Sequence, residues 1–171
     1  QPLPDKPVVI TMDDGYRDNF LYALPILEKF GFTATVFITT NTIAPEGVNN
    51  NMLTWSMVKE MSKRGITIGC HTLDHPQLTR VNYNEAWRQI ADAKNAIEEN
   101  LGSKVDVFAY PYGSHDSCVE NIVKESGFRA AVTVNPKPVT SAENPFALNR
   151  MGIYSNLSRD GFINKLASAE G

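Results

Sequence analysis

The sequence predicts an α/β fold built on a mainly parallel sheet, which is either open or closed into a barrel with fewer than eight strands. Six short apolar runs alternate with segments whose apolar residues repeat at helical spacing, and this alternation is typical of right-handed βαβ units. The length of 171 residues, with 42% apolar residues and no break in composition, fits a single domain over residues 1–171.

Each expected strand is a short apolar or β-branched run that is followed by a turn signal. The six runs are residues 8–12, 34–39, 66–71, 105–110, 130–134 and 148–154. Thr54 and Asp116 are expected as N-caps of two of the helices, which lie at residues 20–30, 54–64, 84–101, 116–127 and 158–167. Pro25 either bends the first helix or marks its true start, and a Pro-rich loop at residues 135–145 precedes the last strand.

Charge and composition exclude several classes of function. The 16 Lys and Arg residues against 19 Asp and Glu residues give a formal charge of −3, which gives no support to binding of nucleic acid or of an anionic membrane surface. No apolar run approaches the roughly 20 residues of a membrane-spanning helix. The polar, Pro-rich start at residues 1–4 is typical of a linker or of the trimmed edge of a longer protein. Cys70 and Cys118 are expected to be buried free thiols, with Cys70 facing away from the side on which His71 lies.

Polar residues follow three of the predicted strands. Asp13 and Asp14 end the first strand, His71 and His75 follow the third, and residues 111–113 follow the fourth. In parallel α/β folds, active sites form at the carboxyl ends of the strands, so these residues are expected to share one rim. Two imidazoles and a carboxylate are a common ligand set of catalytic zinc, and a second carboxylate can take a proton from metal-bound water. The sequence therefore predicts a hydrolytic metal site.

Simpler interpretations exist for each part of this pattern. An Asp-Asp-Gly segment is an ordinary turn, and a His-x3-His pair can arise by chance. Their joint occurrence at the predicted rim favours the metal site, because two of only three histidines fall there. The third, His115, is expected to be a solvated turn residue before the Asp116 cap. Asp74 is expected to support a ligand or to face solvent, and Trp55 is expected to pack in the core.

Three segments resemble the motifs of the polysaccharide deacetylases of carbohydrate esterase family 4. They are residues 11–15 (TMDDG), residues 71–75 (HTLDH) and residues 108–113 (FAYPYG), in the order that the family uses. The resemblance spans nearly the whole chain. It implies a distorted (β/α) barrel, and for this chain we expect about six to seven mainly parallel strands.

The resemblance also implies a role for each matching residue. Asp13 would be the catalytic base, and the metal ligands would be Asp14, His71 and His75, holding Zn²⁺ or another divalent ion such as Co²⁺. The backbone N–H of Tyr112 would stabilise the tetrahedral oxyanion. The implied activity is removal of acetyl groups from a polysaccharide, most often N-deacetylation of a polymer containing N-acetylglucosamine, and in some relatives O-deacetylation of xylan. We expect a monomer that acts on this polymer outside the cytoplasm, in the cell envelope or after secretion.

The chain departs from the family pattern at two points. Ala109 stands where the family has an arginine that holds the catalytic aspartate ionised and oriented. Arg150 can replace it if it returns to the rim and pairs with Asp13 within about 5 Å; otherwise Arg150 is a surface charge. No histidine follows His115, although the family's last motif supplies one as the general acid.

In the poly-N-acetylglucosamine deacetylases the motif order is permuted, and the histidine that acts as the general acid precedes the Asp-Asp-Gly strand. This chain resembles that group at residues 4–7 (PDKP) and 109–113 (AYPYG). The resemblance therefore predicts that the histidine belongs to an N-terminal segment outside this sequence. An alternative is a glycan-binding domain that keeps the fold and the metal but lacks turnover.

Overall fold

The computed structural model describes residues 7–48, 50–139 and 144–167, so the predicted linker at residues 1–4 and the middle of the 135–145 loop lie outside the described residues. Neighbouring strands are all parallel and follow one another in chain order, and the strands are β1 (Thr11–Met12), β2 (Thr35–Ile38), β3 (Thr67–Cys70), β4 (Val107–Ala109) and β5 (Ala130–Val132). The sheet curls into a half-barrel, which confirms the predicted distorted (β/α) barrel, although the described part of the chain has five strands rather than six or seven.

The sixth predicted strand, at residues 148–154, is reduced to one parallel bridge between Leu148 and Val132. A continuing parallel ladder would give the carbonyl of Thr133 to the backbone N–H of Arg150. That carbonyl instead accepts a hydrogen bond from Arg150 Nε at 2.7 Å, and the backbone N–H of Arg150 bonds to Asn135 O at 3.0 Å. The guanidinium thus takes the place of the ladder and ends the strand.

The first strand is also shorter than predicted. Pairing with β2 begins at Ile10, whose carbonyl accepts from Thr35 N at 2.9 Å, and β1 itself covers only Thr11–Met12. Val8 and Val9 are exposed, so the prediction of a buried strand was wrong for them. Since β1 is the edge of the sheet and pairs only with β2, no second neighbour covers these side chains.

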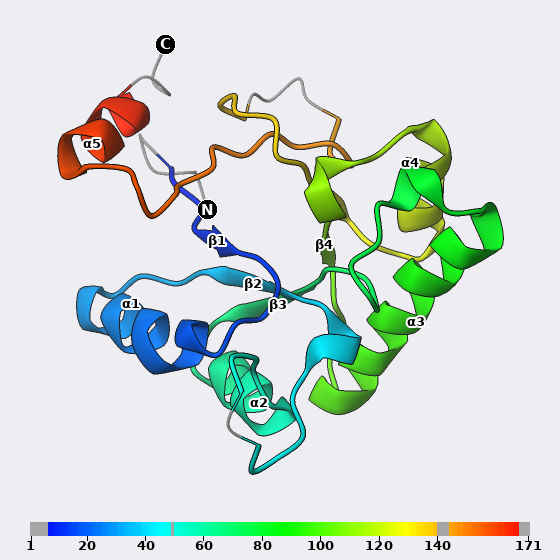
Figure 1. Cartoon of the computed structure of the whole chain (residues 1–171), viewed down its shortest axis with the longest axis horizontal. Helices are drawn as coiled ribbons and strands as arrows, with labels where there is room; N and C mark the ends of the chain where they lie inside the picture. The colour runs from blue at the N-terminus through cyan, green and yellow to red at the C-terminus, as the bar shows by residue number, and fades with distance from the viewer. Residues whose placement is uncertain (1–6, 49, 140–143, 168–171) are drawn as a thin grey trace.

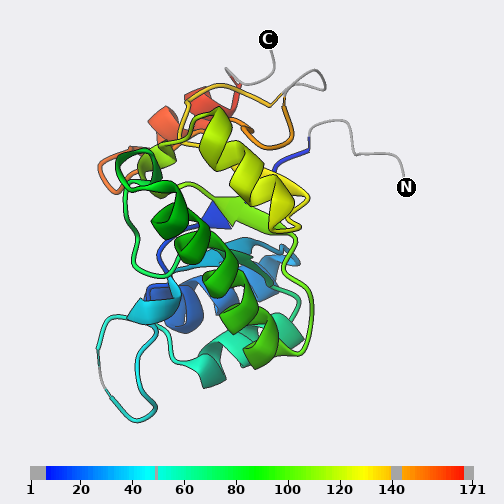
Figure 2. The same cartoon turned by 90° about the vertical axis from the view of Figure 1, so that its right-hand side faces the viewer.

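Four of the five helices in the described residues pack around the outside of the curled sheet, and the last helix, near the C-terminus, lies apart from it (Figure 1). Their bounds are α1 (Leu24–Phe30), α2 (Trp55–Lys63), α3 (Tyr83–Leu101), α4 (Ser117–Glu125) and α5 (Arg159–Ala167). Figures 1 and 2 show α3 and α4 side by side on one flank, and the two helices are in contact. Short helical turns η1 (Asn19–Ala23), η2 (Thr40–Thr42), η3 (Leu78–Arg80) and η4 (Pro111–Gly113) complete the described elements.

The predicted helix starts are largely confirmed. Thr54 caps α2 by accepting from Met57 N at 3.4 Å, and Asp116 caps α4 by accepting from Val119 N at 2.9 Å. Pro25 lies in the first turn of α1, after the π-helical turn η1, so it marks the true start of the helix. The longest helix begins one residue earlier than predicted, because Asn82 is its cap.

The two cysteines differ in burial. Cys70 belongs to the hydrophobic core, and burial raises the pKa of its thiol to about 12. Cys118 is exposed, so the expectation of a buried thiol was wrong there. The buried face of α4 is formed by Val119, Ile122 and Val123, and the position before Val119 falls on the outer face.

None of the helices in the described ranges is both long and apolar enough to cross a membrane.

Candidate metal centre

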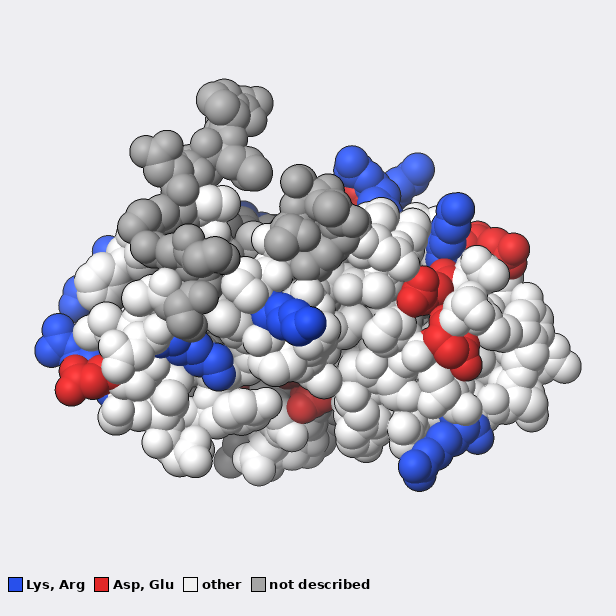
Figure 3. Space-filling view, turned by 90° about the horizontal axis from the view of Figure 1, so that it is seen from above, with Lys and Arg blue, Asp and Glu red and all other residues white. Residues whose placement is uncertain are grey.

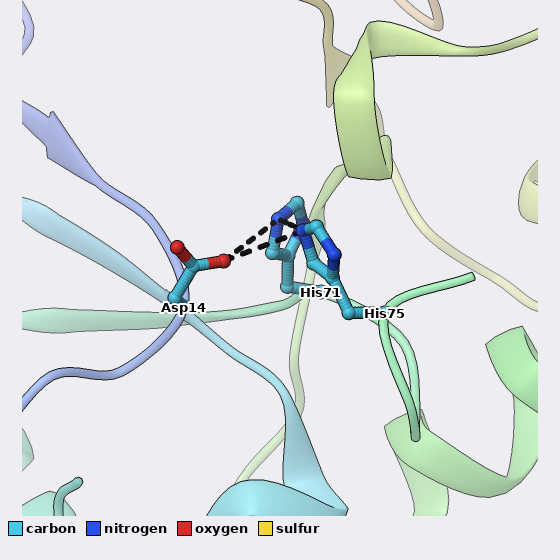
Figure 4. Close-up of side chains that lie close together, drawn as sticks. All are labelled: Asp14, His71 and His75. Carbon is cyan, nitrogen blue, oxygen red and sulfur yellow. Dashed lines mark hydrogen bonds and ion pairs between the residues drawn. The ribbon is translucent and has the colours of Figure 1, made fainter. Parts of the chain in front are cut away.

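Three side chains converge at the carboxyl ends of β1 and β3 (Figure 4). Asp14 follows β1, His71 follows β3, and His75 lies four residues further along the chain. Asp14 Oδ1 lies 3.4 Å from His75 Nε2 and 3.6 Å from His71 Nε2, and the two Nε2 atoms are 3.1 Å apart. The structure therefore brings together the three residues that the sequence analysis named as ligands.

The triangle of donor atoms fits a zinc ion. Zinc holds nitrogen and oxygen ligands at about 2.0–2.1 Å in a tetrahedron, whose corners are then roughly 3.3–3.4 Å apart. The observed separations of 3.1, 3.4 and 3.6 Å lie on both sides of that value. With a zinc ion bound, these three donors would occupy three corners and leave the fourth for water or substrate, as in catalytic zinc sites.

The environment of His71 prepares its Nε2 to be a ligand. The side chain is 2% exposed, and its Nδ1 donates to the carbonyl of Ala109 on β4 at 2.7 Å. Because a carbonyl only accepts, the proton of the neutral ring sits on Nδ1 and the lone pair of Nε2 points into the site. Burial lowers the pKa of His71, and the nearby charge of Asp13 partly opposes this effect.

The backbone of the site is unusual. Among the described residues, four non-glycine residues have a left-handed backbone, with φ between 59° and 71°, and they are Asp14, Thr72, His75 and Tyr112. All four lie in the three segments that follow β1, β3 and β4. Each such conformation costs on the order of 1–3 kcal/mol and persists only where the surroundings enforce it. Strain confined to these segments is typical of a functional site.

Asp13 lies beside the three donor residues and is held by Arg150. Nη1 and Nη2 of Arg150 donate to Oδ1 and Oδ2 of Asp13, both at 2.7 Å, in a bidentate pair. The guanidinium also donates to Thr133 O at 2.7 Å and Thr11 Oγ1 at 3.2 Å, and it lies over the ring of Phe37. Arg150 is only 15% exposed, so the interpretation as a surface charge is wrong. Its separation of 2.7 Å from Asp13 lies well within the distance that the sequence analysis required for a pair.

Tyr112 lies at the same rim with its ring in solvent. The residue is 65% exposed, and its ring meets that of His75 edge to face at a centroid distance of 4.7 Å. Its φ of 59° turns the backbone within η4, a turn that is closed by Gly113 N donating to Tyr110 O at 2.8 Å. The side chain is thus positioned to contact a ligand, while the backbone follows the path fixed by the turn.

Comparison with known proteins identifies the family. The family model "Polysaccharide deacetylase" matches residues 1–131, which is more than half of the chain. The chain belongs to the polysaccharide deacetylase family. Arg150 lies beyond the residues that the family model matches. The observation that it pairs with Asp13 therefore rests on the structure and not on the family match.

Relatives of this chain are found in several bacteria. The chain is 30% identical to YxkH of Bacillus subtilis, over 92% of this chain and 55% of that protein. It is 26% identical to the poly-beta-1,6-N-acetyl-D-glucosamine N-deacetylase of Staphylococcus aureus, over 95% of this chain and 61% of that protein. This sequence thus spans somewhat more than half the length of these curated relatives.

Solved structures share the fold. Deacetylase PplD of Streptococcus pyogenes, determined in complex with acetate, superposes with a TM-score of 0.87 at 28% identity, covering 96% of this chain and 73% of PplD. IcaB from Ammonifex degensii superposes with a TM-score of 0.84 at 25% identity, covering 99% of this chain and 75% of IcaB. Both likenesses extend past residue 131 and therefore include the segment that carries Arg150.

Two polar residues near the three motifs behave differently from each other. Asp74 turns away from the three donor atoms, and hydrogen bonds from Asn41 and Gln89 lower the pKa of its carboxyl group. It supports the segment between the two histidines, as expected. His115 lies in the turn before Asp116 and outside the three donor residues, as expected, but its side chain is only 29% exposed, because it stacks on the ring of Tyr110 and its Nδ1 donates to Gly113 O at 2.9 Å.

Sequence reasoning missed the groups that hold the site residues. Thr11 and Thr133 support Arg150, and Gln89 supports the segment between the histidines. Only Gln89 left a signal in the sequence. It falls on the apolar face of α3, between the buried residues Ala86 and Ile90, where a polar side chain needs internal partners.

Proposed function

We propose that this chain is a metal-dependent deacetylase that removes acetyl groups from a polysaccharide, with Asp14, His71 and His75 as the zinc ligands and Asp13 as the base. One observation carries the proposal: three donor atoms 3.1–3.6 Å apart lie beside a second carboxylate that is oriented by a bidentate arginine. A binding protein has no evident need for Asp13 in that position, whereas hydrolysis needs a group that takes a proton from water.

The reaction would proceed by addition of water to the acetyl carbonyl. When bound, a zinc ion lowers the pKa of its water toward about 7 and polarises the acetyl oxygen. Asp13 takes one proton from the attacking water as the oxygen bonds to the carbonyl carbon. The carbon–nitrogen bond would then break and acetate would leave, while the sugar nitrogen takes one proton from solvent and becomes a free amine. That proton balances the one that Asp13 took from water and afterwards returns to solvent.

Arg150 and Tyr112 would orient the reacting groups. The bidentate pair holds both oxygens of Asp13, which would restrict how the carboxylate meets the attacking water. The backbone N–H of Tyr112 would donate to the oxyanion that forms on the acetyl oxygen. His115 stays outside this scheme, because its Nδ1 bonds to Gly113 and its Nε2 lies 3.5 Å from Glu120.

A neutral N-acetylglucosamine polymer fits the chain as substrate. The Staphylococcus aureus relative is named for poly-beta-1,6-N-acetyl-D-glucosamine, and PplD was determined with acetate, which is the product expected here. Lys and Arg side chains are scattered over the face seen in Figure 3 and form no continuous basic patch there, which agrees with an uncharged partner. With such a polymer as substrate, we expect the reaction to take place outside the cytoplasm.

The test is release of acetate from N-acetylglucosamine oligomers and from acetylated xylan. Protein stripped with a chelator should be inactive, and Zn²⁺ or Co²⁺ should restore activity. Asp13→Asn is the matched inactive control. Release from the oligomers would support N-deacetylation, and release from xylan alone would shift the substrate to an ester.

Failure of the reloaded protein on every substrate, with zinc bound, would favour the alternative of a glycan-binding domain without turnover. That alternative then predicts binding of the same oligomers, measurable by calorimetry. A protein that neither binds zinc nor releases acetate would contradict the proposal altogether.

A further inference from the structure

The segment from Thr72 to His75 connects the two histidine ligands and needs external support. Thr72 and His75 both have a left-handed backbone, with φ of 70° and 60°, and Thr72 is β-branched, which makes this conformation unfavourable. Its carbonyls are held from one side, because Thr40 N donates to Thr72 O at 3.1 Å and Asn41 N donates to Leu73 O at 3.0 Å. The N–H groups of Leu73 and Asp74 face the opposite side, toward α3, whereas that of His75 donates to Thr72 Oγ1 at 3.0 Å.

The buried side-chain amide of Gln89 on α3 makes most of the hydrogen bonds on that opposite side. Two further bonds come from the same helix, because Leu73 N also donates to the backbone carbonyl of Gln89 at 3.2 Å and Arg88 Nη2 donates to Asp74 Oδ2 at 3.4 Å. Gln89 is 2% exposed. Its Oε1 accepts from Leu73 N at 3.1 Å and from Asp74 N at 2.9 Å, and its Nε2 donates to Asp74 Oδ2 at 2.7 Å and to Glu85 Oε1 at 2.9 Å. All four hydrogen-bonding positions of the amide are used, three of them on the segment between the ligands.

We propose that Gln89 is the positioning residue of the metal centre: it sets the spacing of His71 and His75 without touching the ion. This inference rests on the proposed function, because it concerns the affinity of the same three ligands for zinc. An amide fits the position, since it accepts from two backbone N–H groups and donates to a carboxylate whatever the pH. A carboxylate there can accept but cannot donate, and an apolar side chain can do neither.

Asp74 extends this support to the other side of the segment. Its Oδ1 accepts from Asn41 Nδ2 at 2.6 Å, while its Oδ2 accepts from Gln89. The carboxylate thus joins α3 to η2, which holds the carbonyls of the same segment. Gln89 and Asp74 together fix the path of the chain from one ligand to the next.

The competing explanation is that Gln89 only stabilises the packing of α3. That explanation predicts a loss of folding stability without a change in zinc affinity. Positioning predicts a loss of zinc affinity and altered coordination in a protein that remains folded. Supporting partners of metal ligands are typically worth about 10- to 100-fold in metal affinity.

The test uses two substitutions and one compensated pair. Gln89→Glu keeps the shape and the acceptor of the side chain but places its second oxygen against the carboxylates of Asp74 and Glu85. Combining it with Asp74→Asn restores a donor opposite that oxygen. Asn100→Ala is the control, because it removes an amide from the same helix away from the site. Zinc affinity is measured by competition with a chromophoric chelator, coordination by the visible absorption of the Co²⁺ form, and folding by urea unfolding without metal.

We expect Gln89→Glu to weaken zinc binding about 10- to 100-fold and to change the Co²⁺ spectrum, and the pair with Asp74→Asn to recover most of the loss. Asn100→Ala should keep the affinity of the unchanged protein. Zinc affinity and a Co²⁺ spectrum that stay the same in Gln89→Glu would overturn the inference. If Gln89→Glu does not fold, Gln89→Met serves instead, and unchanged affinity in that variant is equally decisive. Absence of zinc binding by the unchanged protein would instead overturn the proposed function, and this inference with it.

Discussion

His71 and Asp13 lie at the same rim, but the structure holds them in different ways. His71 is buried, bonds to the backbone of β4, and belongs to a segment that is supported by α3 and η2. Asp13 is 29% exposed and is held by the side chain of Arg150, 137 positions away in the sequence. We call His71, His75 and the segment between them the ligand side, and Asp13 with Arg150 the base side. The ligand side is held by the sheet and its helices, whereas the base side depends on a segment that follows the last strand in the sequence.

This difference means that metal binding and proton transfer can be separated by mutation. The three ligand residues come from the first 75 residues of the chain. The support of Asp13 comes from Arg150. The same guanidinium bonds to Thr133 O, where a sixth strand would have continued its ladder. We expect changes on the base side to lower turnover without loss of zinc, and changes on the ligand side to lower both.

Asp13→Asn should have the largest effect on turnover. It removes the group that takes the proton, so kcat/KM for acetate release should fall by about 10²- to 10⁴-fold. Zinc affinity should stay the same, because the three ligands are unchanged. Asp92→Asn, at an exposed position on α3, is the matched control. A parallel loss of zinc in Asp13→Asn would show that the two sides cannot be separated.

Two substitutions of Tyr112 should distinguish the contribution of its backbone N–H to turnover from that of its ring. Tyr112→Pro removes the proposed N–H donor and cannot adopt the φ of 59°, so kcat should fall by about 10²- to 10³-fold. Tyr112→Gly keeps the N–H and readily adopts this φ, so kcat should change far less, while KM rises if the ring contacts the substrate. Equal losses of kcat in the two variants, measured with N-acetylglucosamine oligomers, would assign the role to the ring.

Cys70 can report on opening of the ligand side. It is the residue before His71 and is buried, with its pKa raised to about 12, so the thiol is protonated and unreactive near pH 8 in the folded protein. Cys118 is exposed and should be alkylated by iodoacetamide first. If opening requires release of the metal, zinc at 100 times its Kd should slow labelling of Cys70 about 100-fold and leave Cys118 unaffected. Peptide mass spectrometry measures both rates, and equal slowing at both sites would refute local opening.

The sequence predicted the ligand side better than the surroundings of the base. A β-branched run, a helical period and a cap are local signals, and they placed β3 and α3 and put the two proposed histidine ligands at the carboxyl end of β3. Arg150 was named only because Ala109 stands where the family has an arginine that pairs with the catalytic aspartate. No local pattern in the sequence shows that the guanidinium of Arg150 ends the last strand. The partial burial of the His115 side chain was missed for the same reason, since its stacking on Tyr110 depends on how η4 packs. Local periodicity does not specify contacts between distant segments.

Arg150→Lys should give the smallest of these effects and tests the base side most directly. Lysine keeps the charge but cannot form the bidentate pair, so at least one charge-assisted hydrogen bond to Asp13 is lost. We expect kcat/KM to fall roughly tenfold, which corresponds to about 1.4 kcal/mol, and the free energy of unfolding in urea to fall by about 1–3 kcal/mol. Arg129→Lys is the matched control, because this arginine is 80% exposed in its pair with Asp106 and should change stability by less than about 1 kcal/mol. Zinc affinity should be the same in both variants, and a loss of zinc in Arg150→Lys alone would mean that the guanidinium also positions the ligand Asp14 through its neighbour.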